Sequence, residues 1–482
     1  MKRSQRLIAG VSAALLIAGA APVAPAVAQE DPPACTYCAG GEYHPVVPTR
    51  IFDSRSPTEA ELDRPINDVA PLGAKPMSSL RPTFDIQLLG LDDAEFDRPW
   101  VPAGVESDNV LALAVSITVI SPTSRGFLGA YPAGSPSFTS IVNFGAGQTV
   151  ANLSIVRPGV DDFLTIFLHG DVAGSAHVVV DVYGWFSTTG YDGDDDVLDD
   201  AERGGRLIAV SPGRVLDTRP SSVGPGSVTE LTIRGVDTIG PSPVVDLVPN
   251  SADVVGVLVN VTIVTPTANT FVSVVPDAPS GLPSTSNLNT TVGVTKANMA
   301  MVPVGADGKI RLYHHAGSSK LIVDVLGYIQ RRLDDTREGR VIPLTAPFRA
   351  LDTRQPAFGA VPLGPGQAED WSFASFVNSV TVSGVPVGNQ SALLGNLTNA
   401  RLDRQYPTVA VTSYLTVYPT PPTAGDPPTV SNLNSVESST TDPRAVPNMA
   451  LVKYGTDTQV RVFNSKGYAH YILDVSAVVL AD

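Results

Sequence analysis

One phrase of about ten residues occurs three times along the chain. It reads PTRIFDSRS from Pro48, SPGRVLDTRP from Ser211 and APFRALDTRQ from Ala346. Each copy has an arginine, two apolar residues, an aspartate, a hydroxyl residue and a second arginine. A closing phrase also repeats, as VVVDVYG, LIVDVLG and YILDVSA, more than 100 residues after each opening aspartate. A period this long and this variable predicts three domain-sized repeats, because solenoid repeats are shorter and nearly constant in length.

Short runs of alternating apolar and polar residues fill each repeat. An example is VNVTI from Val259 to Ile263, and clusters of Pro, Asp, Ser and Gly separate such runs. Alternation with period two is typical of β-strands. We therefore predict an all-β fold of three tandem antiparallel β-sandwiches of jelly-roll type. A propeller is the alternative, although its blades of roughly 40 to 50 residues are shorter than these repeats.

The repeats and the segments around them divide the chain into seven parts. We expect a signal peptide at 1–28, a segment with two cysteines at 29–42, repeats at 43–187, 206–330 and 340–482, and linkers at 188–205 and 331–339. The first part has basic residues, an apolar run and the small-residue sequence AVAQE, which is the pattern of a secretory signal. We therefore expect a secreted or cell-surface protein with no membrane span after signal removal.

Charge and cysteine content restrict the expected partners. The formal net charge is −15 at pH 7, which repels nucleic acid and anionic membranes. Cys35 and Cys38 are the two cysteines, and in an oxidising compartment they predict a local disulfide. The acidic linker contains Asp192, Asp194 and Asp196 without the Gly and Glu of an EF-hand loop, so we expect no cofactor beyond weakly bound calcium.

The repeated charged residues predict a structural clasp in each repeat. The closing aspartates Asp181, Asp324 and Asp474 lie between apolar neighbours, where an unpaired buried carboxylate would cost several kcal/mol. An arginine binds a carboxylate through two parallel hydrogen bonds. We expect each closing aspartate to contact an opening arginine, and each opening aspartate to orient the arginine beside it. The arginines are Arg50, Arg55, Arg214, Arg219, Arg349 and Arg354, and the opening aspartates are Asp53, Asp217 and Asp352.

Asparagines also recur at matching positions. The residues are Asn260, Asn287, Asn289 and Asn298 in repeat 2, and Asn396, Asn432, Asn434 and Asn448 in repeat 3. Such amides either bind sugar hydroxyls or satisfy backbone groups in turns and bulges, and we favour the second role. A sugar site would also need an exposed aromatic residue. The candidates are Trp100, Tyr131, Trp371, Tyr414 and Tyr418.

The phrases of this chain resemble those of secreted tandem-repeat proteins from high-GC Gram-positive bacteria, which are marked by LDTR, N-x-T, SNLN, AN and a closing VVDVxGYF. Repeat 2 matches best, at 216–219, 260–262, 286–289, 297–298 and 322–328. Repeat 1 departs with Ser116 in place of Asn and SIVN in place of SNLN, and repeat 3 departs with Ser476 and Ala477 near its end. The resemblance implies export and a modular architecture, and it implies no particular activity.

The sequence contains no complete catalytic set that we identify. Asp-Thr-Arg stands where an aspartic protease has Asp-Thr-Gly, and a G-x-S-x-G elbow does not occur. His177 and His470 lie at matching positions, but Lys320 replaces them in repeat 2, which indicates solvated strand-edge side chains and no metal site.

We therefore predict a non-catalytic, adhesive or structural β-domain array. Its expected partner is a component of the cell envelope or another extracellular surface, either a glycan or a second copy of the chain. Three weak sites on one chain would bind a repetitive surface far more tightly than one site. The alternatives are a carbohydrate-binding protein of the cell envelope and an envelope hydrolase with an unrecognised site.

Overall fold

The computed structural model describes most of the chain from residue 40 onward. The described residues are 6–7, 40–55, 72–73, 83–89, 109–170, 174–188, 191, 204–332, 334, 336–382, 385–400, 412–421, 427–435 and 445–481. Cys35, Cys38, Trp100 and the three linker aspartates lie outside these ranges. The disulfide and the calcium site therefore stay predictions.

Each repeat contributes two antiparallel sheets, and we call the sheet with the opening and closing strands the inner sheet. In repeat 1 its strands are, in order, β2 (Tyr43–Asp53), β10 (Ser175–Ser187), β5 (Val110–Ile120) and β8 (Val150–Val156), with β3 (Leu72–Gly73) also paired to β10. In repeat 2 they are β11 (Arg206–Asp217), β18 (Lys320–Gln330), β13 (Val254–Val264) and β16 (Lys296–Pro303). In repeat 3 they are β19 (Val341–Asp352), β28 (Tyr471–Leu480), β23 (Gln390–Asn399) and β26 (Val446–Lys453).

The outer sheets also share one strand order. In repeat 1 the strands are β4 (Thr83–Gln87), β9 (Phe163–Gly170), β6 (Gly126–Pro132) and β7 (Val142–Phe144). In repeat 2 they are β12 (Val228–Thr232), β17 (Lys309–His314), β14 (Thr270–Val275) and β15 (Leu288–Thr290). In repeat 3 they are β20 (Gln367–Ser372), β27 (Gln459–Asn464), β24 (Ser413–Pro419) and β25 (Leu433–Ser435), with β1 (Arg6–Leu7) parallel to β20. The conserved order means that equivalent residues of the repeats can be compared one by one.

The remaining elements are short. They are the helix α1 (Ala374–Ser379), the hairpin of β21 (Thr381–Val382) and β22 (Val385–Pro386), and the 3₁₀ turns η4 (Val160–Asp162), η5 (Pro356–Phe358) and η6 (Thr456–Thr458). Within the described ranges, no helix has the length and apolar character needed to cross a membrane.

Apart from the opening strands β2, β11 and β19, which keep exposed residues, the inner strands are largely buried on both faces. Every residue of β8 is buried, and in β5 only the last residue is partly exposed. One face of each inner sheet packs on the outer sheet of its own repeat, around a separate apolar core. The other face packs on a cluster that all three inner sheets share. Burial on both faces explains near-continuous apolar runs such as VLALAV, which one solvated face would not allow.

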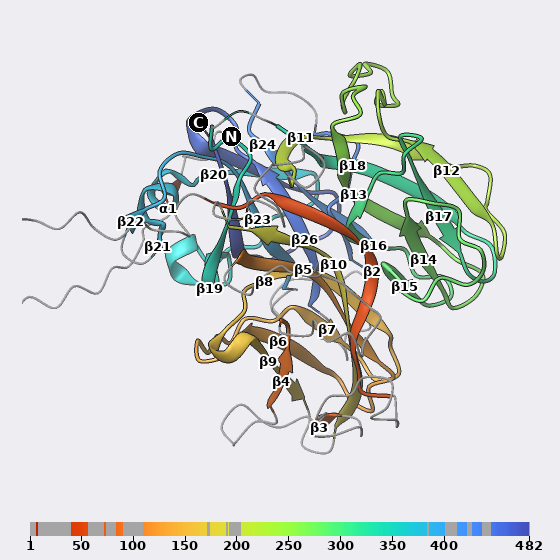
Figure 1. The fold of residues 1–482 in the computed structure, drawn as a ribbon, viewed down its shortest axis with the longest axis horizontal. Coiled ribbons are helices and arrows are strands. Elements are labelled where there is room, and N and C mark those ends of the chain that lie inside the picture. The colour runs from red at the N-terminus through yellow and green to blue at the C-terminus, as the bar shows by residue number, and fades with distance from the viewer. Residues whose placement is uncertain are drawn as a thin grey trace, which may run out of the picture.

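Three edge strands meet at the centre of the molecule (Figure 1). β8, β16 and β26 contact one another pairwise. Equivalent residues of the three strands belong to the shared cluster, with Leu153, Met299 and Met449 at one position and Ile155, Met301 and Leu451 at the next. Exposed sheet edges invite aggregation, and packing the three edges together removes them from solvent.

The starting segments of the repeats bond to one another in a closed set. Tyr43 and Gly205 exchange two backbone hydrogen bonds, Gly41 and Val341 exchange two more, and Leu207 N donates to Gly339 O. The residues at the equivalent positions between them are Glu42, Arg206 and Arg340. Arg206 is fully buried and its Nε lies 3.3 Å from Glu42 Oε1, while Arg340 Nη2 lies 3.6 Å from the same oxygen. The one acidic residue of the three thus lies near both arginines and offsets their mutual repulsion.

The all-β prediction is confirmed, and the arrangement of the sheets differs from the expected tandem string. Six small antiparallel sheets lie in a ring, as in a β-propeller. Figure 1 shows repeat 1 in orange at the bottom and repeat 2 in green at the right. Because the inner sheets share one apolar cluster, the repeats do not separate into three independent sandwiches. Loop-length variation between the repeats had suggested autonomous domains, but it carries no information on how the repeats pack.

Candidate functional site

The opening and closing phrases lie side by side in every repeat. The register places Arg50 opposite Asp181 across β2 and β10, and the equivalent pairs are Arg214 with Asp324 and Arg349 with Asp474. The arginine Nε donates to the carboxylate Oδ1 at 2.9, 2.8 and 2.9 Å in the three repeats. Nη2 donates to Oδ2 at 3.4, 3.3 and 3.0 Å. Each closing aspartate therefore contacts the first opening arginine through both carboxylate oxygens.

The second arginine binds the opening aspartate. Arg55, Arg219 and Arg354 each donate from Nε to the Oδ1 of the aspartate two residues before, at 2.9, 2.8 and 2.8 Å. The hydroxyl residue between them accepts a hydrogen bond from the closing strand. The bonds are Val178 N to Ser54 Oγ at 2.8 Å, Leu321 N to Thr218 Oγ1 at 2.9 Å, and Tyr471 N to Thr353 Oγ1 at 3.0 Å. The first arginine and the hydroxyl residue thus hold the opening strand against the closing strand, and the second arginine and the opening aspartate bind each other.

Burial and charge pairing act differently on the two kinds of aspartate. Asp324 has a side chain that is 1% exposed, and burial raises its pKa while the Arg214 hydrogen bonds oppose the rise only in part. Asp217 lies nearer to solvent, and the hydrogen bond from the Arg219 side chain lowers its pKa. The closing aspartate is therefore the residue whose charge depends on its partner.

Most of the repeated asparagines bond inside their own repeat. Asn287 Oδ1 accepts from Val274 N at 2.6 Å, and Asn432 Oδ1 accepts from Val417 N at 2.8 Å. Asn298 Nδ2 donates to Asn287 O at 2.6 Å, and Asn448 Nδ2 donates to Asn432 O at 2.5 Å. These contacts fix the loop before β15 and β25, which is the backbone role favoured from the sequence.

A second set of asparagine contacts joins different repeats. Asn448 Nδ2 of repeat 3 donates to Asn260 Oδ1 of repeat 2 at 2.9 Å, and Asn448 Oδ1 accepts from Met299 N at 2.9 Å. Asn260 Nδ2 in turn donates to Ser431 O of repeat 3. Edge-strand amide groups that would otherwise be unpaired at the centre are satisfied in this way.

The same contacts recur between repeats 3 and 1 through a residue that the sequence reasoning missed. Asn152 of repeat 1 lies at the position of Asn298 and Asn448. Its Nδ2 donates to Asn396 Oδ1 at 2.9 Å, and its Oδ1 accepts from Met449 N at 3.0 Å. The dipeptide AN in VANLSIV was the available signal.

The link between repeats 2 and 1 is different. Ser116 stands in repeat 1 where the other repeats have Asn260 and Asn396. Its Oγ is buried and has no hydrogen-bond partner. The serine side chain is shorter than that of asparagine, so the side-chain hydrogen bond that joins the other repeats is missing between repeats 1 and 2.

Each outer sheet carries an aromatic pair beside an asparagine. Both rings are partly exposed in repeats 2 and 3, whereas in repeat 1 Phe127 is partly exposed and Phe167 is only 1% exposed. The pairs are Phe127 with Phe167, Phe271 with Tyr313, and Tyr414 with Phe463, with ring centroids 5.9, 6.3 and 6.1 Å apart. The asparagines directly across the strands from the first rings are Asn143, Asn289 and Asn434. We call each set an aromatic–asparagine patch. The patches of repeats 2 and 3 present two partly exposed rings and an amide at one position of the fold, and the patch of repeat 1 presents one such ring, Phe127, beside its amide.

The other predicted aromatics do not form an exposed platform. Trp371 is 1% exposed and Tyr418 is 6% exposed, so both belong to the interior of repeat 3. Trp371 Nε1 donates to Tyr471 Oη at 2.6 Å. Tyr131 is partly exposed and contacts the buried Phe167 of repeat 1, with ring centroids 5.9 Å apart, whereas Tyr414 belongs to the patch of repeat 3. Strand aromatics with a buried partner for their polar atom commonly fill cores.

The two histidines that the sequence predicted to be solvated, His177 and His470, differ in exposure. His470 is 5% exposed, and its Nδ1 lies 3.2 Å from Thr353 Oγ1. His177 is half-buried, with Nδ1 3.2 Å from Ser54 Oγ. The solvated assignment is therefore wrong for His470, because the clasp hydroxyl holds the ring against the sheet. Among the described residues, no group of three or more acidic, histidine or cysteine side chains could hold a metal.

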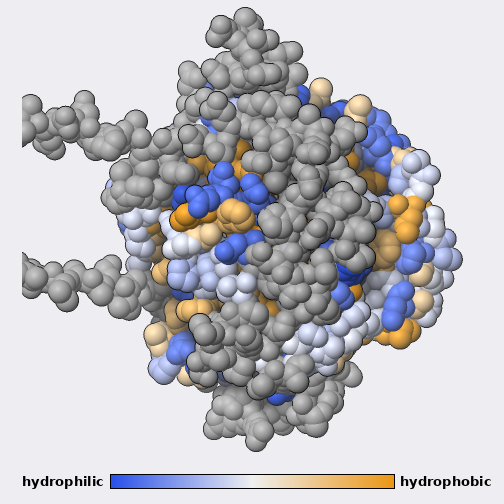
Figure 2. Space-filling view, turned by 60° about the horizontal axis from the view of Figure 1, so that its bottom comes forward, coloured by the Kyte–Doolittle hydropathy of each residue, from blue (hydrophilic) through white to orange (hydrophobic). Residues whose placement is uncertain are grey.

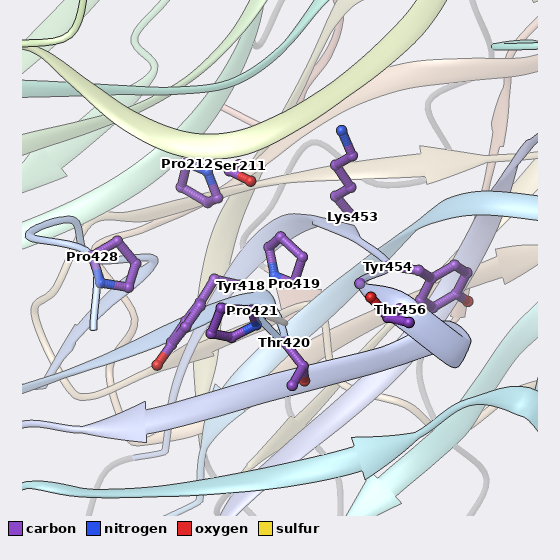
Figure 3. Close-up of a pocket in the computed structure, with 11 residues that line it drawn as sticks. Ser211, Pro212, Tyr418, Pro419, Thr420, Pro421, Pro428, Lys453, Tyr454 and Thr456 are labelled. Atoms are coloured by element: carbon purple, nitrogen blue, oxygen red, sulfur yellow. The ribbon is translucent and has the colours of Figure 1, made fainter. Parts of the chain in front are cut away.

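One pocket of about 520 Å³ lies between repeats 2 and 3. Its walls are mainly proline and tyrosine, with Lys453 as the charged residue (Figure 3). The lining residues are Ser211 and Pro212 of β11, with Tyr418, Pro419, Thr420, Pro421, Pro428, Lys453, Tyr454, Gly455 and Thr456 of repeat 3. Such walls suit an apolar or proline-containing ligand segment.

Comparison with known proteins gives no family. No protein-family model matches the sequence, and no curated protein is similar to it. The tandem CBM22-1-CBM22-2 domain of Xyn10C from Paenibacillus barcinonensis shares 11% identity over 46% of this chain and 79% of that chain, with a TM-score of 0.14. The structure of Sulfolobus Turreted Icosahedral Virus shares 9% identity over 85% and 86%, and an archaeal-virus triple jelly roll from a turret assembly shares 8% over 91% and 90%, both with TM-scores of 0.16. TM-scores this low carry no argument about function.

Proposed function

We propose that the protein is a non-catalytic, secreted or cell-surface protein whose three jelly-roll-like repeats act as one structural or adhesive unit. The observation that supports this most directly is the use of the repeated polar residues. The clasp residues bond to one another, and Asn260, Asn396 and Asn448 bond across the boundaries between repeats. The repeated polar residues therefore bond within the fold, either inside a repeat or between repeats.

A closed ring gives such a unit fixed outward faces. The three inner sheets share a core, so the outer sheets are held at constant spacing and orientation. When several weak sites are held rigidly, their simultaneous engagement of a repetitive surface raises the apparent affinity by orders of magnitude. This supports attachment to a polymeric or cell-surface partner.

Retention on cells tests the adhesive role. Fluorescently labelled mature protein should remain on intact cells or on isolated envelopes after washing, whereas an unrelated acidic β-sandwich protein should not. A matched control is the mature chain after thermal unfolding, which has the same charge without the ring. Absence of retention on cells, envelopes and a surface coated with the protein itself would contradict the proposal.

Carbohydrate recognition is the second candidate, and the three aromatic–asparagine patches favour it. Phe271 and Tyr313 of repeat 2 are partly exposed on the outward face, and Asn289 lies across the strands from Phe271. Aromatic faces stack on the apolar faces of sugar rings, and amides hydrogen-bond to their hydroxyls. The cross-strand aromatic pairs also stabilise the sheet, so the test must separate binding from folding.

Binding of wild type, single variants and a triple variant to a glycan array, with a check that each variant is folded, separates sugar binding from folding. The variant Phe127→Ala, Phe271→Ala, Tyr414→Ala should lose at least about 100-fold in apparent affinity, and each single variant should lose far less because two patches remain. Val160→Ala, at an exposed aliphatic residue, is the matched control. Equal binding by wild type and the folded triple variant would exclude these patches as the sugar site.

A hydrolase with an unrecognised site remains a third prediction. Incubating the mature protein with envelope polysaccharides and peptides, followed by mass spectrometry of released fragments, tests it.

A further inference from the structure

A rigid hairpin projects its apolar tip into solvent from repeat 2, in the connection between β12 and β13. Val236 O accepts from Leu247 N at 2.9 Å, and Thr238 N donates to Val244 O at 3.0 Å. Asp237 Oδ1 accepts from Asp246 N at 2.8 Å. These bonds hold 236–247 in one conformation.

The base of this hairpin packs on the opening strand. Ile239 N donates to Arg214 O at 2.8 Å. A Cβ at Gly213 would lie only 2.5 Å from Thr238 Cγ2, so the glycine is needed for the close approach. The hairpin is therefore anchored beside the clasp of repeat 2.

The tip is unusually apolar for an exposed turn. Val244 and Val245 are 53 and 67% exposed, and Ile239, whose backbone anchors the base, is 46% exposed. The segment between Ile239 and Val244 is Gly-Pro-Ser-Pro. Figure 2 shows apolar residues at the surface of repeat 2, on the right of the view, among hydrophilic ones. Exposed apolar groups on a rigid projection are typical of interaction sites.

The pocket between repeats 2 and 3 has complementary chemistry. Pro212 and Pro419 face each other across it, and Tyr418 and Pro421 form the floor in the view of Figure 3. Grooves lined by aromatic and proline side chains bind proline-containing segments, because both surfaces are rigid and lose little entropy. Lys453 lies at the pocket, whereas the hairpin carries Asp237 and Asp246.

We infer that the hairpin tip of one copy docks into the proline-lined pocket of a second copy. The chain carries both halves of the contact, the apolar tip at Val244 and Val245 and the pocket lined by Pro212 and Pro419. A net charge of −15 makes two copies repel, so a cation at the receiving pocket and acids beside the inserting tip supply the local complementarity. Reciprocal docking gives a dimer, and docking in one direction gives a chain of copies.

This inference deepens the proposed adhesive function by naming a second copy as a partner. The two can fail separately, because retention on cells and envelopes at low protein concentration does not depend on self-association, and only the surface coated with the protein itself tests both.

Sedimentation velocity of the mature protein over a concentration series tests the contact. Wild type should show a concentration-dependent increase in mass. The tip variant Val244→Ser, Val245→Ser and the pocket-filling variant Thr456→Trp should each weaken self-association by roughly tenfold or more. Val160→Ser, at a 63% exposed residue of repeat 1, should associate like wild type.

Mixing the two variants sharpens the test. The pocket-filled variant retains an intact tip and the tip variant retains an intact pocket, so the mixture should form heterodimers more strongly than either variant alone. Thermal melting of each variant checks that the fold is kept. Monomeric wild type at its highest soluble concentration, or association unaffected by both variants, would overturn the inference.

Discussion

The boundary between repeats 2 and 3 and the boundary between repeats 1 and 2 are equivalent in position and different in hydrogen bonding. At the first, Asn448 binds both Asn260 and Met299 N, and Ser431 N donates to Asp324 at 3.3 Å. At the second, Ser116 Oγ is buried without a partner, and Arg50 Nη2 donates to Ser284 O at 3.0 Å near the protein surface.

The difference separates two contributions to one assembly. Apolar packing at the centre is present at every boundary, and it has no preferred direction. The buried amides are directional, so they fix which strand edges meet and in which register. We therefore expect the boundary of repeats 2 and 3 to be the more sensitive one, and the following experiments test this from the largest effect to the smallest.

Removing the charge of a closing aspartate should lower the stability most. Asp324→Asn removes the nearer carboxylate of Arg214, which is 13% exposed, and leaves only Asp217 at 3.7 Å. We expect a loss of about 3 to 5 kcal/mol in the free energy of unfolding. Denaturant unfolding of the full mature chain measures it. Asp217→Asn, beside the exposed Arg219, should cost far less. An unchanged unfolding free energy in Asp324→Asn would show that the clasp does not stabilise the fold.

Removing a central amide should distinguish the two boundaries. Asn448→Ala leaves Asn260 Oδ1 and Met299 N without a partner and should cost about 2 to 3 kcal/mol. Asn298→Ala, at the equivalent position facing Ser116, should cost about 1 kcal/mol less. Equal losses in urea unfolding would mean that the boundaries do not differ in hydrogen-bond strength.

Acid should weaken the boundary of repeats 1 and 2. His44 stacks on Trp185 at 4.1 Å and lies against Gly204. Burial and, to a smaller degree, Arg331 lower the pKa of His44 from 6.5 to about 3. The unfolded chain takes up this proton first, so the contribution is complete above pH 6.5 and decreases as the pH falls toward 3. At pH 5 the loss should be about 2 kcal/mol.

His44→Phe keeps a stacked ring without a titrating group. The variant should show a smaller drop in unfolding free energy between pH 7 and pH 5 than wild type. Identical drops would assign the pH dependence to other groups.

Adding the missing amide at the boundary of repeats 1 and 2 should change the stability least. Ser116→Asn would give repeat 1 the amide that repeats 2 and 3 have, with Asn298 and Ser286 O as the expected partners. We expect a gain of about 1 kcal/mol. Ser116→Ala, which only removes the unpaired hydroxyl, serves as the control. A gain in thermal stability that is no larger for Asn than for Ala would contradict the equivalence of the three boundaries.

The sequence predicted contacts within a repeat better than contacts between repeats. Asp181, Asp324 and Asp474 had to be paired because of their apolar neighbours, and the repeated arginines were the available partners. Asn260, Asn396 and Asn448 were expected to satisfy backbone groups, but their partners in other repeats were not foreseen. Nothing in one repeat specifies which residue of another repeat will face its strand edge.

The sequence by itself determined the strand pattern, the threefold repetition and the charged clasp, because alternation and charge burial are local requirements that any all-β arrangement must meet. Only the tertiary structure decided that β8, β16 and β26 join at a common core, that Ser116 leaves one link unmade, and that Pro212 and Pro419 line a shared pocket. The physical reason is that the free energy of burying an apolar face depends on its area and hardly on which apolar residues form it, so the sequence of one face does not identify its partner. Which faces meet is set by the combined shape and hydrogen bonding of residues that lie far apart in the chain.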